Sequence, residues 1–307
     1  MSMSAPIAPT ERAEETRSRP ADGEPPGREI VVGVDGTEVG LGAVRWAVQE
    51  AARRNAPLKI LHAAPYVGRS GPDGSPPPEL PRARGITAVA YTVARRSGAG
   101  VQASTEVVPA EPVDALLRAA AGSQLLVLGS STTGAADEMV LATVAARVAG
   151  RSPVPVVVVP RRRGPAPNGR PVVAILGVGE RADDEAVALF AAAAAQGTAV
   201  PLALLQTRAA QQDVAASWVD DDEAWAQRFP GLDVQRSELP AARGNQVLAA
   251  ACPSPLLIIS AGRGTLLHRS LDGPHRWLLR HCTSPMALVP SVHRVEREDA
   301  TEGPPPG

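Results

Sequence analysis

The chain has 307 residues and a formal net charge of -1 at pH 7, so no overall field would draw it to nucleic acid or to an anionic membrane. This length exceeds the usual size of one domain and predicts two hydrophobic cores, which must be aliphatic because aromatic residues are only 3%. Its two cysteines are too few for a disulfide framework or a thiolate zinc site, which predicts a reducing, cytoplasmic location.

Apolar runs and amphipathic stretches alternate along the first half of the chain. Strands are predicted at 29–34, 58–63, 101–107, 125–128 and 154–159. Helices are predicted at 40–54, 86–96, 113–121 and 143–149, with a Pro/Gly-rich loop at 67–82. Because strands alternate with helices, right-handed crossovers should cover a parallel sheet on both faces.

The chain restarts after position 169 and repeats this order. Strands are predicted at 171–176, 200–205, 255–259 and 285–289, and helices at 183–196, 245–251 and 274–282. A long polar loop is predicted between 205 and 245. The small apolar run at 186–195 is too short to span a bilayer, which takes roughly 18 residues or more, so a buried helix is predicted there.

Composition divides the chain into five parts. We predict a disordered arm at 1–27, a first domain at 28–161, a linker at 162–169, a second domain at 170–291 and a disordered tail at 292–307. The closing units 147–160 and 278–290 share a helix, a short turn, a strand led by proline and a final proline. An internal duplication explains this similarity better than chance does.

The first candidate site is the segment 31–37, an apolar strand that ends in Asp35, Gly36 and Thr37. In an open parallel sheet, ligands bind beyond the carboxyl ends of the strands, so Asp35 could accept hydrogen bonds from a nucleoside. The alternative is that Asp35 or Thr37 only caps the helix that follows.

The second candidate site is the segment 128–134 together with 142–144. Backbone N–H groups in such a strand-to-helix turn suit an oligophosphate, and Thr143 could add a hydroxyl. The segment does not match the P-loop motif of NTPases, because Ala135 and Ala136 stand where that motif requires Lys and Ser/Thr. The alternative is a polar surface turn without a ligand.

Together these segments resemble the universal stress protein family, and the resemblance covers the first domain. The start 31–37 with the helical sequence 43–51 is close to the start of the family, and 59–63 resembles its second strand. Members that hold ATP have Gly-x-x-Gly, nine residues, then Gly-Ser/Thr after the fourth strand. Gly129 and Thr143 match that signature, whereas Thr132 and Ala142 stand where it has glycine and add a Cβ near the phosphates.

The resemblance implies an α/β fold of two tandem open parallel-sheet sandwiches with helices on both faces, similar to the adenine nucleotide alpha hydrolases. It implies a non-catalytic stress-response protein with ATP or another adenine nucleotide in the first domain. The implied site residues are Val34, Asp35, Gly36, Thr37, Ala63, Leu128, Gly129, Ser131, Thr132, Ala142, Thr143 and Val144. It also implies pairing through the final strands, within the chain or as a homodimer.

The second domain resembles the family more weakly. Leu176 is aligned there with Asp35, and the segment 273–275 stands near the third glycine and hydroxyl, so a degenerate site is expected. The main rival is a structural or interaction module without a ligand, in contact with an unknown protein partner. A less favoured rival is a dinucleotide-dependent enzyme using Gly177, Gly179 and Ala182, although the next strand lacks the acid that holds the ribose.

Other polar clusters predict no chemistry. The histidines 268, 275 and 281 and Cys282 have no recognised metal spacing, and we expect surface helix residues with one core thiol. His62 lies in an apolar strand without a recognisable Ser or Cys nucleophile around it. No metal site and no hydrolase activity are predicted.

Overall fold

The computed structural model describes residues 28–65, 77, 79–97, 100–130, 144–161, 169–178, 181–207, 217–239, 244–262, 271 and 273–291. The first half contains β1 (Ile30–Gly33), α1 (Glu38–Arg53), β2 (Leu58–Ala63), α2 (Leu80–Arg96), β3 (Ala103–Val108), α3 (Pro112–Ala121), β4 (Leu125–Ser130) and β5 (Val156–Pro160). Residues 144–149 are also helical. Strands alternate with helices, as the sequence predicted.

The second half contains β6 (Val172–Leu176), α5 (Arg181–Thr198), β7 (Leu202–Thr207), the 3-10 helix η2 (Trp218–Asp220), α6 (Asp222–Arg228), β8 (Val234–Leu239), α7 (Gly244–Ala251), β9 (Leu257–Ser260), α8 (Gly273–His281) and β10 (Met286–Val289). None of the helices in the described ranges has the length and hydropathy needed to cross a bilayer.

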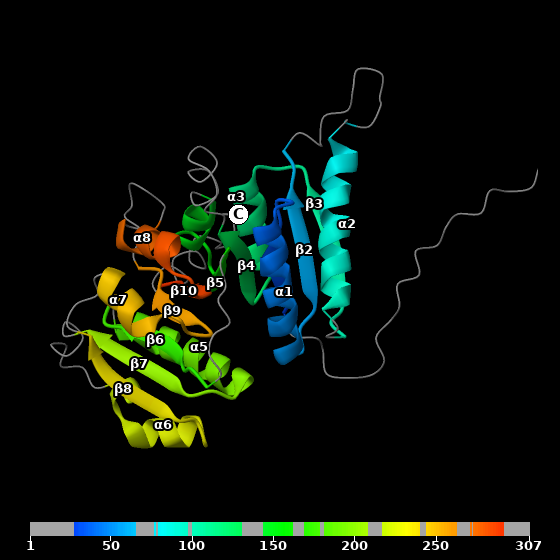
Figure 1. Ribbon diagram of the computed structural model, residues 1–307. Coiled ribbons are helices and arrows are strands. Elements are labelled where there is room, and N and C mark those ends of the chain that lie inside the picture. The colour runs from blue at the N-terminus through cyan, green and yellow to red at the C-terminus, as the bar shows by residue number, and fades with distance from the viewer. Residues whose placement is uncertain are drawn as a thin grey trace, which may run out of the picture.

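All ten strands join one sheet in the order β3-β2-β1-β4-β5-β10-β9-β6-β7-β8. Within each half every pair of neighbouring strands is parallel, and the only change of direction in this order is between β5 and β10. From β5 outward the order is β5-β4-β1-β2-β3, and from β10 outward it is β10-β9-β6-β7-β8. Strands at the same place in the two halves therefore follow the same order along the chain. Figure 1 shows the two sets of strands meeting at β5 and β10.

The junction of β5 and β10, called the seam below, is an antiparallel ladder in which Val157 lies opposite Ala287. This confirms the predicted pairing of the final strands within the chain. Strand β5 lies between β4 and β10, and β10 lies between β5 and β9. A homodimer through the same strands would need this sheet to open.

Helices cover both faces of the sheet because successive strand residues point to opposite sides. Residues of α1, α2, α5 and α6 pack on the face that carries Ile30 and Val32. Residues of α3, α7, α8 and the helical segment 144–149 pack on the face that carries Val31. The doubly covered α/β sheet that the sequence predicted is confirmed.

Two expectations about the elements are wrong. Helix α2 begins at Leu80, inside the range expected to be loop, with Pro81 in its first turn where the missing N–H is tolerated. The expected polar loop after β7 contains η2, α6 and the edge strand β8. Strand β8 is mostly exposed, so its sequence lacks the apolar run of a central strand. The predicted domain boundaries stay predictions, because 162–168 lie outside the described residues.

Candidate functional site

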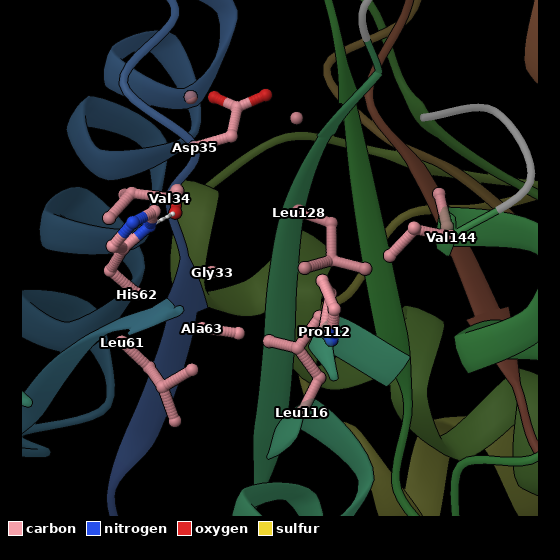
Figure 2. Close-up of a pocket in the computed structure, with 13 residues that line it drawn as sticks. Gly33, Val34, Asp35, Leu61, His62, Ala63, Pro112, Leu116, Leu128 and Val144 are labelled. Carbon is pink, nitrogen blue, oxygen red and sulfur yellow. Dashed lines mark hydrogen bonds between the residues drawn. The ribbon is translucent and has the colours of Figure 1, made fainter. Parts of the chain in front are cut away.

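A pocket of about 160 Å³ opens at the carboxyl ends of β1, β2 and β4. Its lining is Gly33, Val34, Asp35, Gly40, Leu61, His62, Ala63, Pro112, Leu116, Leu128, Gly129, Val144 and Ala145. Figure 2 shows that Leu116 and Leu128 approach the cavity from α3 and β4, with Val144 facing them from the helical segment 144–149. The pocket is therefore apolar inside and lies where open parallel sheets bind ligands.

Asp35 supplies the carboxylate at the rim of this pocket. Its Oδ1 accepts hydrogen bonds from the backbone N–H of Thr37 at 2.9 Å and from the Thr37 hydroxyl at 2.7 Å. No hydrogen bond from a described residue reaches Oδ2, and the side chain is exposed. Asp35 can therefore accept a hydrogen bond from a ligand through Oδ2 and keep the two hydrogen bonds that Oδ1 accepts from Thr37.

Thr37 is the N-cap of α1, because its hydroxyl accepts a hydrogen bond from the N–H of Gly40 at 3.2 Å. Capping thus explains Thr37, which does not line the pocket. Capping does not account for Oδ2 of Asp35, which is left available to a ligand. Of the two interpretations of this segment, helix capping therefore applies to Thr37 and ligand binding to Asp35.

Close packing shapes the pocket at three glycines, against backbone at Gly129 and against side chains at Gly33 and Gly40. A Cβ on Gly129 would lie 3.0 Å from the carbonyl carbon and oxygen of Val39, so β4 touches the first turn of α1 directly. A Cβ on Gly33 would lie 2.7 Å from Cδ2 of Leu128, inside the apolar floor. A Cβ on Gly40 would lie 2.9 Å from Oδ1 of Asp35. Larger residues at these positions would fill or distort the cavity.

His62 is a polar pocket residue that the sequence reasoning missed. Its Nδ1 lies 2.8 Å from the carbonyl oxygen of Val34 (Figure 2), which joins the ends of β2 and β1. The signal was available, since the predicted site residue Ala63 is its neighbour and parallel strands end at the same edge. In the sequence, His62 was considered only as a partner for a nucleophile.

The structure brings together six of the twelve predicted site residues. Val34, Asp35, Ala63, Leu128, Gly129 and Val144 line the pocket. Gly36, at φ +86°, and Thr37 form the adjoining turn and do not line it. The other four, Ser131, Thr132, Ala142 and Thr143, lie outside the described residues. Lining residues that the sequence reasoning did not name are Gly33, Gly40, Leu61, His62, Pro112, Leu116 and Ala145.

The family model of the universal stress proteins matches residues 27–160, the range that holds β1 to β5 and the whole pocket. Residues 27–160 form a domain of the universal stress protein family. A universal stress protein of Mycobacterium tuberculosis is 29% identical over 246 residues, which are 78% of this chain and 83% of that relative. The match therefore extends beyond the range of the family model.

A solved structure of a universal stress protein has a fold similar to that of this chain. This structure, from Archaeoglobus fulgidus DSM 4304, has a TM-score of 0.62 and 13% identity, covering 85% of this chain and 96% of that one. A universal stress protein solved in complex with cAMP is 31% identical, covers 44% of this chain and 98% of that one, and has a TM-score of 0.36.

Strand register relates the two halves of the chain. Val31 and Val173 hold equivalent places in β1-β4-β5 and β6-β9-β10. Four residues further on, Gly177 takes the place of Asp35, and Leu176 takes the place of Val34. The alignment of Leu176 with Asp35 is therefore wrong by one residue, because runs of apolar letters do not define register. The conclusion that this position lacks a carboxylate holds.

In the second half, polar side chains lie at the carboxyl ends of β6 and β9, which correspond to β1 and β4, and they bond to one another and to the backbone. Oδ1 of Asp184 accepts a hydrogen bond from the N–H of Gly177 at 2.8 Å, and Oγ of Ser260 lies 3.5 Å from Oδ2 of Asp183. Nε2 of His275 lies 2.9 Å from the carbonyl oxygen of Ser260. His275 is 3% exposed, so its expected place on the surface is wrong. Its partner, Ser260, is the last residue of β9, and the spacing of residues in the sequence does not predict this contact.

Proposed function

We propose that the pocket at the ends of β1, β2 and β4 binds an adenine nucleotide and that the protein acts as a nucleotide-responsive, non-catalytic stress protein. The single observation that carries this is the combination of an apolar cavity with the exposed Oδ2 of Asp35 at its rim. A nucleoside has the complementary parts, a flat apolar base and sugar hydroxyls that donate hydrogen bonds.

The size of the pocket agrees with a base. An engineered apolar cavity of about 150 Å³ takes up benzene, and the present cavity has about 160 Å³. Leu61, Leu116 and Leu128 offer the apolar contacts that a purine needs. We propose that Ser131, Thr132, Ala142 and Thr143, which lie outside the described residues, hold the phosphates.

The non-catalytic part of the proposal rests on the lining residues. Among the thirteen side chains and glycines that form the described wall, Asp35 and His62 are the only ones with a titratable group. The Nδ1 atom of His62 is already engaged with the carbonyl oxygen of Val34. We propose that binding instead biases the association of the protein with a partner, in the cytoplasm.

We also propose that the chain is a tandem of two domains of this family, with a degenerate site in the second. The repeated strand order on both sides of the seam supports this. Gly177 in the place of Asp35 supports the loss of nucleoside binding in the second domain, as does the cluster of Asp183, Asp184 and His275 at its strand ends.

The direct test is native mass spectrometry of freshly purified chain, followed by thermal unfolding with and without millimolar ATP or AMP. A bound adenine nucleotide, or a rise in Tm by mass action, is expected. Asp35→Ala should clearly reduce the rise, because a charge-assisted hydrogen bond contributes about 1.5–3 kcal/mol, or roughly tenfold to a hundredfold in Kd. Asp114→Ala is the matched control, since this exposed carboxylate on α3 is two residues after the lining residue Pro112 but outside the lining.

The second candidate function is an interaction module that holds no nucleotide. The specific observation in its favour is that Thr132 and Ala142 replace two glycines of the phosphate signature. A chain that stays empty at millimolar ATP would support it and reject the nucleotide proposal. Bound NAD would instead support the dinucleotide enzyme, and an unchanged thermal shift in Asp35→Ala would reject the assigned site.

A further inference from the structure

The two cysteines of the chain, 30 residues apart in sequence, come together in the second half. Cys252 follows the last residue of α7, and Cys282 follows the last residue of α8. Their sulfur atoms lie 3.2 Å apart. Cys252 is partly exposed, whereas Cys282 is buried at 6% exposure. Cys252 is therefore the more accessible of the two cysteines to a reagent from solvent, and its sulfur is in contact with that of the buried Cys282.

The surroundings give the two thiols different acidities. The contact with Cys282 lowers the pKa of Cys252 to about 6, against the opposing effect of burial, and hydrogen bonds from the Ser284 side chain and backbone act in the same direction. The same contact and burial raise the pKa of Cys282. At neutral pH the exposed sulfur is thus the thiolate and the buried sulfur keeps its proton, which is the arrangement of an attacking thiol with a resolving thiol.

We propose that Cys252 and Cys282 form a thiol–disulfide site that an oxidant of the peroxide class closes. In the first step the thiolate of Cys252 attacks a peroxide oxygen, the O–O bond breaks, and Cys252 becomes a sulfenic acid while the leaving oxygen departs as water after protonation. In the second step the sulfur of Cys282 attacks Cys252, the S–O bond breaks, and the S–H proton leaves with the hydroxyl as a second water. Both cysteines are oxidised by one electron each, and the peroxide takes up two electrons. A low-molecular-weight thiol reverses the reaction by exchange.

The backbone around the pair is already held in place for this bond. The N–H of Ser254 donates to Oγ of Ser284 at 2.9 Å, so the segments that follow the two cysteines are joined by a second contact. Closing the gap from 3.2 Å to the S–S bond length of about 2.05 Å takes a movement of only about 1 Å. These segments lead into β9 and β10, so oxidation would tie together the connections that precede two central strands.

The test uses the full chain, first reduced and then treated with a small excess of hydrogen peroxide. Quenching with iodoacetamide in denaturant, followed by peptide mass spectrometry, should show alkylatable thiols falling from two to none, with the peptides of Cys252 and Cys282 linked within one chain. Tm should rise by several degrees and return on reduction, because a cross-link restricts the unfolded chain.

Two variants separate this route from general oxidation. Cys282→Ser should leave the sulfur of Cys252 without a resolving partner, so that sulfenic and then sulfinic acid accumulate there. Cys252→Ser should leave Cys282 alkylatable only after unfolding and not oxidised by the same dose. The proposal is overturned if both wild-type thiols stay alkylatable, if the linkage joins two chains, or if Cys282 is oxidised at the same rate in Cys252→Ser. None of these readouts depends on nucleotide binding.

Discussion

Gly40 and Gly42 lie in the same helix, α1, but only Gly40 lines the candidate pocket. A methyl group on Gly42 would meet no atom within 4 Å. A methyl group on Gly40 would lie 2.9 Å from Oδ1 of Asp35, the oxygen that accepts both hydrogen bonds from Thr37. The same substitution should therefore have different effects at two positions two residues apart.

Replacing glycine by alanine inside a helix stabilises it by roughly 0.5–1 kcal/mol when nothing opposes the new methyl group. Gly42→Ala should raise the free energy of unfolding by that amount. Gly40→Ala has the same gain, but the carboxylate of Asp35 must turn and lose two hydrogen bonds of about 0.5–1.5 kcal/mol each. The net change at Gly40 should lie between about zero and a loss of about 2.5 kcal/mol.

Urea unfolding followed by circular dichroism measures both variants against the wild type. Gly42→Ala should bind nucleotide as the wild type does, and Gly40→Ala should bind it more weakly because Asp35 has moved. Equal stabilisation by the two substitutions would refute the reasoning, since it would mean that the carboxylate moves at no cost. Equal nucleotide affinity would separately refute the role of Asp35.

Further predictions concern charge, the seam and the thiols. Burial raises the pKa of Glu50, but ion pairs with Arg54 at 2.6 Å and Arg53 at 2.5 Å outweigh it, so the pKa is lowered in the folded protein. The stability that these ion pairs contribute is therefore present above the pKa of Glu50 in the unfolded chain. It is lost as the pH falls through the lower pKa of Glu50 in the folded protein. Glu50→Gln should reduce the free energy of unfolding by about 1–3 kcal/mol at neutral pH. Its difference from wild type in urea unfolding should shrink as the pH falls below the unfolded pKa of about 4.5. Ala287→Asp places an unpaired charge in the fully buried seam and should destabilise by about 3 kcal/mol or more; a wild-type urea midpoint would contradict this burial. Alkylation of Cys252 by iodoacetamide should level off above about pH 6, and a rate that still rises steeply near pH 8.5, as for an ordinary thiol, would reject the lowered pKa.

The central strands and their helices could be predicted from the sequence because their patterns are local. The segment 58–63 was predicted as a strand from its apolar run, and β2 covers the same residues. Strand β8 was missed because it is an edge strand with exposed polar residues. Its adjoining aromatic cluster of Trp218, Trp225 and Phe229 depends on contacts between η2 and α6 that no periodicity reveals.

The site could be predicted only where a strand end defines it. Asp35 and Gly129 followed from the rule that ligands bind beyond the carboxyl ends of parallel strands. Pro112 and Leu116 reach the pocket from α3, and only the packing of that helix on the sheet brings them there. The one-residue error at Leu176 has the same origin, because hydrogen-bond register is a property of strand pairs.

The pairing of Val157 with Ala287 has an evolutionary consequence. In a symmetric homodimer a residue on the twofold axis meets its own copy, so any substitution changes both sides of the contact at once. In this chain the two sides of the contact are different sequence positions, so that a valine at 157 can face the smaller alanine at 287. Each half of the chain is thereby free to accumulate its own substitutions at this contact, and a small side chain on one strand can compensate for a larger one on the other.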